Sequence, residues 1–135
     1  MLPETSSDPL ITDSDVEERV RFLLTAAIQR RFWLFLLDAE HRQRPTLVPV
    51  DGIPARPAPD DGERLAPMLD FVAEAEGAQS LVIVHERPGP VGVTAADAEW
   101  ARCLRTAAAR AELPVRASIL LHDGGTRWLA PDDWI

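Results

Sequence analysis

The chain contains no lysine: all 14 of its basic residues are arginine, and they are not gathered into a stripe or patch. Without such a patch there is nothing to neutralise a row of phosphates, so we expect no nucleic-acid binding. The exclusive use of arginine, together with abundant alanine, indicates a GC-rich genome, and we expect a bacterial source.

Cysteine is almost absent as well. The single Cys103 excludes an internal disulfide and a zinc site built from cysteines. No apolar run is long enough to span a bilayer, and the first residues lack the basic and apolar regions of a secretory signal. We therefore expect a cytoplasmic protein that does not contact a membrane.

What is present fits one globular domain. Apolar residues make up 46% of the 135 positions and charged residues 27%, which is enough for a sizeable core. The net charge of −8 arises largely in residues 1–18, which contain six acids and no base. We predict a flexible acidic arm over residues 1–13, a single domain over residues 14–131 and a short tail over residues 132–135.

Five segments have the pattern of strands. The first and third have apolar residues on both faces, which is typical of strands covered on both sides of a sheet. The second is the hairpin partner of the first, and its Pro49 predicts an edge position or a bulge because proline cannot donate to a ladder. A turn at residues 123–125 joins the last two. The predicted strands are residues 31–38, 46–51, 81–85, 115–121 and 126–130.

Three segments have helical spacing of their apolar residues. Gly77 is a typical stop for the second helix, and Thr94 with Asp97 is a typical capping pair for the third. The predicted helices run from a cap at Asp13 or Ser14 to about Gln29, over residues 61–76, and from Thr94 to about Leu113. The resulting order α-β-β-α-β-α-β-β predicts an α/β fold, a three-layer sandwich around a mixed central sheet.

Residues 80–97 are the most informative stretch for function. The buried strand ends in the polar residues 85–87, a loop rich in proline and glycine follows, and Thr94 and Asp97 open the next helix. A strand end that delivers polar side chains to a loop before a helix is a common location for sites in α/β proteins.

Several strings, in this order and spacing, resemble the JAB1/MPN (JAMM) metalloprotease fold, and most closely its RadC-like branch. The resemblance covers residues 19–130 and implies the three-layer sandwich that this family shares with the cytidine deaminases. The deaminase motif itself, His-x-Glu followed by Pro-Cys-x-x-Cys, is missing. The matching strings are the apolar strand that ends in Asp38, residues 81–89, the Thr-x-x-Asp of residues 94–97, and residues 113–124.

In the JAMM family two histidines and an aspartate hold zinc, a serine supports the oxyanion and an upstream glutamate activates the zinc-bound water. The resemblance places His85 at the first histidine, Asp97 at the aspartate and Thr94 at the serine. Arg87 stands at the second histidine, and a guanidinium cannot ligate zinc. No acid lies near Arg30, where the glutamate is expected. We therefore expect no zinc and no catalysis; if a metal binds, His85 and Asp97 are its ligands.

Each of these residues also has a structural interpretation, and both interpretations stay open at this point. His85 is either a metal ligand or a structural histidine whose hydrogen bonds are satisfied in the strand. Thr94 and Asp97 are either site residues or a helix cap. Arg87 either forms a salt bridge with Asp97 or Glu86, filling the former metal position, or binds an anion such as a carboxylate.

Three functional hypotheses follow. The first is a catalytically inactive JAMM-like domain, a pseudoenzyme, that acts as a protein-binding or scaffolding module with another protein or a second copy as its partner. The alternative is a divergent zinc metallohydrolase or isopeptidase that uses His85, Asp97 and a substitute ligand such as Glu86. The third is binding of a small anion at Arg87.

Overall fold

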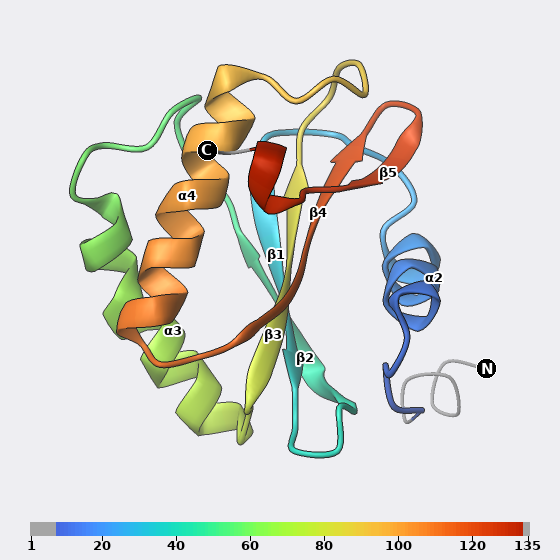
Figure 1. Cartoon of the computed structure of the whole chain (residues 1–135), viewed down its shortest axis with the longest axis vertical. Helices are drawn as coiled ribbons and strands as arrows, with labels where there is room; N and C mark the ends of the chain where they lie inside the picture. The colour runs from blue at the N-terminus through green and yellow to red at the C-terminus, as the bar shows by residue number, and fades with distance from the viewer. Residues whose placement is uncertain (1–7, 134–135) are drawn as a thin grey trace.

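A five-stranded mixed sheet forms the middle of the protein (Figure 1). The computed structural model describes residues 8–133, and within them the strand order is β2-β1-β3-β4-β5. In this sheet β3 and β4 pair in parallel, whereas the other neighbouring strands pair antiparallel. Along the chain the elements are α2 (Asp13–Leu23), β1 (Arg31–Leu37), β2 (Gln43–Val50), α3 (Asp61–Glu76), β3 (Ser80–Glu86), α4 (Ala95–Arg110), β4 (Val115–His122), β5 (Gly125–Trp128) and the 3-10 helix η1 (Pro131–Asp133).

Helices lie on both faces of this sheet. Figure 1 shows α3 and α4 to its left and α2 to its right, and two separate apolar clusters fill the spaces between. Residues 8–133 thus form an α/β fold with a mixed five-stranded sheet and three α-helices, as predicted at that level. Within the described part of the chain, none of the helices has an apolar run that could cross a bilayer.

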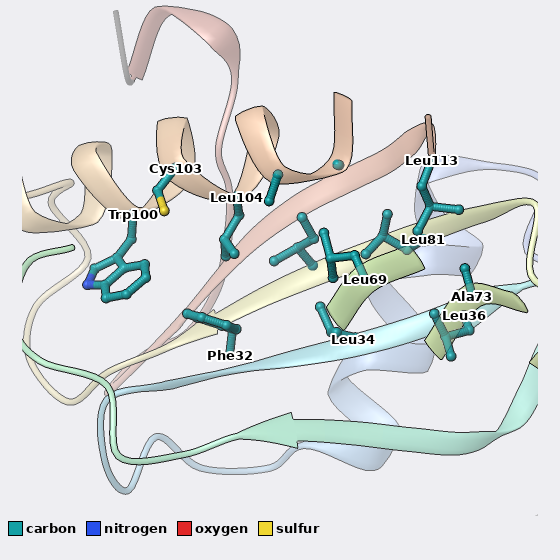
Figure 2. Close-up of a cluster of buried hydrophobic side chains, with 13 residues drawn as sticks. Phe32, Leu34, Leu36, Leu69, Ala73, Leu81, Trp100, Cys103, Leu104 and Leu113 are labelled. Carbon is teal, nitrogen blue, oxygen red and sulfur yellow. The ribbon is translucent and has the colours of Figure 1, made fainter. Parts of the chain in front are cut away.

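Both faces of β1 and β3 are apolar because both are covered. Figure 2 shows the cluster on the α3 and α4 side, where Phe32 of β1 lies beside Trp100 of α4 with the ring centroids 5.3 Å apart. Phe35 and Leu37 belong to the opposite cluster, which includes Val16 of α2. The prediction of two central strands with two apolar faces is confirmed.

The ends of α3 and α4 follow local signals. Gly77 ends α3 with a φ of 67°, a left-handed conformation that glycine adopts readily. Thr94 caps α4 as predicted: its hydroxyl accepts a hydrogen bond from the Asp97 amide, and the Asp97 carboxylate accepts one from the Thr94 amide. α4 ends at Arg110, a few residues before the predicted end. The predicted edge position of β2, which contains Pro49, is also confirmed.

The first helix is shorter than predicted. It begins slightly earlier, with Thr12 and Asp15 as the capping pair, and it ends at Leu23 instead of near Gln29. After this point the backbone becomes extended. The amide of Gln29 and the amide before it donate to the Glu86 carboxylate, so these donors are not available for a helix. A long-range contact therefore takes the place of the last helical turns.

The predicted flexible arm of residues 1–13 is wrong for its second half. Leu10 is buried in the cluster beneath α2, and its amide donates to the His41 carbonyl at 2.7 Å. Burial of an apolar side chain makes this part of the segment a component of the domain. Residues 1–7, the first half of the predicted arm, lie outside the described residues. The predicted tail begins within η1, and its last two residues also lie outside the described part.

Candidate functional site

The end of β3 places three consecutive polar side chains in the interior. His85, Glu86 and Arg87 are only 6%, 2% and 3% exposed. Because side chains alternate along a strand, His85 and Arg87 lie on the α4 side of the sheet and Glu86 lies on the α2 side. Buried charges are stable only when they are paired. The partners of these residues therefore decide what the site can do.

Arg87 and Asp97 form a buried ion pair. Arg87 Nη2 lies 2.8 Å from Asp97 Oδ2, and Nε lies 3.2 and 3.1 Å from Oδ1 and Oδ2. The same guanidinium donates to the carbonyls of Pro90 and Gly92, so the loop between the two residues wraps around it. The predicted pair with Asp97 is confirmed. The alternative pair with Glu86 is wrong because that side chain lies on the other face of the sheet.

Asp97 is contacted by two further residues. Its Oδ1 lies 3.5 Å from Nη1 of Arg30, and its Oδ2 accepts the Thr94 amide at 3.0 Å. Burial raises the pKa of the Asp97 carboxyl, but the hydrogen bonds from Arg87 and Thr94 outweigh burial and hold this pKa below its ordinary value. The carboxylate is ionised at neutral pH, and donors surround both of its oxygens. Thr94 acts as the helix cap, as its structural interpretation predicts.

His85 lies on the same face as this ion pair. Its Nε2 is buried and finds no hydrogen-bond partner among residues 8–133. Burial lowers the pKa of His85, Asp97 raises it, and Arg105 and Arg30 lower it, with a result of about 4. The imidazole is therefore neutral at neutral pH. The prediction of a structural histidine with satisfied hydrogen bonds is wrong for this nitrogen.

These residues do not fit a zinc ion of the JAMM kind. The neutral imidazole of His85 is a suitable donor, but Arg87 is a permanent cation and both oxygens of Asp97 already accept hydrogen bonds. Catalytic zinc needs three protein ligands and an open position. Within the described residues, no group of three or more His, Cys, Asp or Glu side chains is arranged to hold a metal ion. Glu86 cannot complete the set because it points to the opposite face.

The Glu86 carboxylate accepts four hydrogen bonds on the α2 side of the sheet. Arg31 Nε and Trp33 Nε1 each donate to Oε1 at 2.8 Å. The amides of Ile28 and Gln29 donate to Oε2 at 2.7 and 3.1 Å. Burial raises the pKa of Glu86, but these bonds outweigh burial and the pKa lies below its ordinary value. The carboxylate holds the segment before β1 against the end of β3.

Arg87 and Glu86, the two residues predicted to bind a ligand, thus both bind their own chain. Sequence reasoning does not identify the donors around Glu86. Arg31 is directly opposite Glu86 in the antiparallel pairing of β1 with β3, and the residue types alone do not specify this register. Arg30, which the sequence marks only as the position without the expected acid, in fact contacts Asp97.

Comparison with models of known protein families finds no match for this chain, and comparison with curated proteins finds none either. The resemblance to the JAMM family therefore stays a prediction that rests on the strand ending in Asp38, on residues 81–89, 94–97 and 113–124, and on the order of the elements.

Proposed function

We propose that this chain is a catalytically inactive JAMM-like domain of the RadC-like branch that acts as a protein-binding or scaffolding module. The observation that carries the proposal is the buried pair of Arg87 and Asp97, with Nη2 and Oδ2 2.8 Å apart. By the resemblance to the JAMM family, Arg87 stands at the position of the second metal ligand and Asp97 at the position of the third. One of them is a cation and the other is its counter-ion, so the pair takes the place of the metal.

The surroundings of the pair support the same proposal. Arg30 occupies the region where the family has its catalytic glutamate, and its guanidinium lies 3.5 Å from Asp97. Helices on both faces of a mixed sheet are what a JAMM-like three-layer sandwich requires, and we include that architecture in the proposal. His85 at the first ligand position shares its face with both arginines but holds a neutral ring.

The site does not need a metal to hold its segments together, because the ion pair makes the connections that a metal would make. Arg87 binds the Asp97 carboxylate at the start of α4 and the Pro90 and Gly92 carbonyls of the preceding loop. A rigid frame without catalytic groups is suited to presenting surfaces to a partner. As part of the proposal, the partner is another protein or a second copy, and the setting is the bacterial cytoplasm.

A divergent zinc hydrolase is the second candidate, and one observation favours it. His85 offers a neutral imidazole whose Nε2 has no hydrogen-bond partner among residues 8–133. For this function the Asp97 carboxylate would have to leave Arg87 and Arg30, which leaves two uncompensated guanidinium groups beside the metal. The geometry therefore favours the inactive module.

Zinc titration separates the two candidates. The full chain, stripped with a chelator, is dialysed against Zn²⁺, and bound metal is measured by mass spectrometry. We expect no stoichiometric zinc in the unmodified protein and none in His85→Ala. Stoichiometric zinc that a chelator removes and that His85→Ala abolishes would establish the metal site and overturn the proposal. Zinc lost instead in the matched control His41→Ala, an exposed histidine, would mark a surface site and leave the proposal standing.

The Arg87→His variant tests the resemblance itself. This substitution restores a His-x-His pattern with His85, and it frees Asp97 from its main partner. If the frame is that of a JAMM site, the folded variant gains zinc, and its thermal stability rises with zinc concentration. Adding His85→Ala should remove that gain. A folded Arg87→His variant that ignores zinc would argue against a JAMM ancestry.

A further inference from the structure

A groove runs along the outer face of α3, the helix at the lower left in Figure 1. Pro67, Phe71 and Ala75 stand four residues apart and therefore share one side of this helix. A shallow depression of about 340 Å³ lies along this row. A second one, of about 470 Å³, shares Pro67 and Asp70 with it and lies between α3 and the end of α4, where Glu63 and Arg110 also line it. We define the α3 groove by the five residues Pro67, Asp70, Phe71, Glu74 and Ala75.

The groove combines an apolar row with free negative charge. Phe71 is 74% exposed, the highest value among the exposed large hydrophobic side chains of residues 8–133. Asp70 and Glu74 lie along the flank of the apolar row, and their carboxylates have no ion-pair or hydrogen-bond partner within the described residues. Farther along the same flank Glu63 is paired with Arg110 at 3.2 Å.

The residues of the α3 groove are not explained by a contribution to the stability of α3. Asp70 and Glu74 are four positions apart, where two like charges repel. Glu74 also lies in the last turn, which contains no base, although a helix C-terminus favours cations. Phe71 buries little surface within its own chain. The charges of Asp70 and Glu74 therefore destabilise the helix, and Phe71 adds little to the core. All three side chains are instead suited to contacts with a partner.

We propose that the α3 groove binds an amphipathic helix of another protein, with apolar side chains against Phe71 and arginine or lysine against Asp70 and Glu74. The row from Pro67 to Ala75 spans about 12 Å, enough for two turns of a packed helix. The inference rests on the proposed role as a binding module and names the class of its partner.

The negative charge of the α3 groove disfavours the other classes of partner. A second copy that used the same face symmetrically would bring two acidic rows together, which is repulsive. Anionic membranes and nucleic acids are repelled for the same reason. A basic segment is instead attracted over long range by the net charge of −8.

An unbiased selection tests the proposal. Helical peptides of about four turns, displayed on a stable scaffold and randomised on one face, are selected on the immobilised full chain. Binders retained by Phe71→Ser are removed in a counter-selection. This variant is expected to fold because the side chain is largely exposed, and circular dichroism checks that it does. We expect the enriched sequences to combine an apolar row with arginine or lysine along one flank.

Affinities of the enriched peptide, measured by fluorescence anisotropy, complete the test. We expect binding to weaken about tenfold or more in Phe71→Ser and in the double variant Asp70→Asn with Glu74→Gln. Affinity should also fall as salt rises. The matched control is Phe22→Ser on α2, another exposed phenylalanine, and it should bind within about twofold of the unmodified protein.

Several results would overturn the proposal. These are a selection without binders that depend on Phe71, enriched sequences that are acidic or uncharged, or equal affinity for the double variant Asp70→Asn with Glu74→Gln. Sedimentation that reveals a dimer lost in Phe71→Ser would assign the groove to a second copy instead. The zinc titration is independent of all these outcomes, so a failure here with no zinc bound rejects the α3 groove and keeps the inactive module.

Discussion

Arg87 is buried as deeply as the apolar side chains around it, at 3% exposure, so its charge depends on its partners. The Asp97 carboxylate and two backbone carbonyls provide them. Removing one partner of such a pair typically costs about 3–5 kcal/mol, because the other charge remains buried. A lysine would not substitute, since its ammonium lacks the planar fork that reaches carboxylate and carbonyls together. The pair therefore resists piecemeal change, because replacing either partner leaves the charge of the other buried without a counter-ion.

The His85→Leu variant should be at least as stable as the unmodified protein at pH 7. His85 buries an Nε2 without a partner among residues 8–133, and an unmet buried group costs about 1–3 kcal/mol. Leucine fills a similar volume without a polar atom. Urea unfolding followed by tryptophan fluorescence measures the difference. A large loss of stability in His85→Leu would mean that the imidazole makes a favourable interaction.

The same variant should also change the dependence on pH. Folding lowers the pKa of His85 from its ordinary 6.5 to about 4, so between these values the unfolded chain binds a proton that the folded chain does not. Stability at this site is complete above pH 6.5 and falls with pH through that window, by about 2–3 kcal/mol at pH 4.5. Asp97 and Glu86 have lowered pKa values, so their contributions are lost only at lower pH. The stability of His85→Leu should therefore depend less on pH between 4 and 6.5 than that of the unmodified protein.

At the scale of elements, α3 carries an unfavourable charge arrangement that a single substitution can reverse. In Glu74→Arg a base would stand four residues after Asp70 and in the last helical turn, and both positions favour a cation. We expect the free energy of unfolding to rise by about 0.5–1 kcal/mol, with Glu74→Gln in between. Binding of the selected basic peptide should weaken at the same time. Urea unfolding measures the stability and fluorescence anisotropy the peptide binding of the same samples. Unchanged stability would mean that the charge of Glu74 does not destabilise α3.

Elements whose ends depend on nearby residues could be predicted, and elements whose ends depend on distant ones could not. Gly77 ends α3 and the Thr94–Asp97 pair begins α4, and both signals lie within a few residues of the helix end. The end of α2 at Leu23 depends on amide donors that bind Glu86, 57 and 58 residues farther along the chain. Apolar periodicity alone therefore extends that helix too far.

The same distinction holds for the candidate site. The pair of Arg87 and Asp97 could be predicted because only ten positions separate them and a short loop joins them. The contact of Arg30 with Asp97 spans 67 positions and depends on how β1 pairs with β3. The lone Nε2 of His85 likewise depends on three-dimensional packing, which residue types and spacing do not specify.

At the scale of the whole molecule, the segment just before β1 connects the two helical layers. Figure 1 shows this segment crossing from α2 to the sheet. Arg30 in this segment contacts Asp97 of α4, whereas the amides of Ile28 and Gln29 donate to Glu86 on the α2 side. Two carboxylates on opposite faces of the sheet therefore hold the same few residues.

This arrangement predicts that the two carboxylates are energetically coupled. Glu86→Gln and Asp97→Asn keep the shape of each side chain and remove its charge. Glu86→Gln should lower the free energy of unfolding by about 1–3 kcal/mol. Asp97→Asn should lower it by about 3–5 kcal/mol, because Arg87 then stays buried without its counter-ion. Once the first substitution has removed its contacts, the segment before β1 is less ordered. The contacts that the second substitution removes then contribute less to the free energy of unfolding. The double variant should lose less than the sum of the two, by at least about 0.5 kcal/mol.

The matched control pair is Asp97→Asn with Thr12→Ala. Thr12 caps α2 and shares no hydrogen-bond or ion-pair partner with Asp97 among residues 8–133, so these two losses should add within about 0.5 kcal/mol. Hydrogen exchange gives a second readout: the amides of Ile28 and Gln29 should exchange faster in Asp97→Asn, although Asp97 does not contact them. If the losses for Glu86→Gln and Asp97→Asn add as simply as those of the control pair, the segment does not transmit order between the layers, and each side of the sheet is stabilised independently.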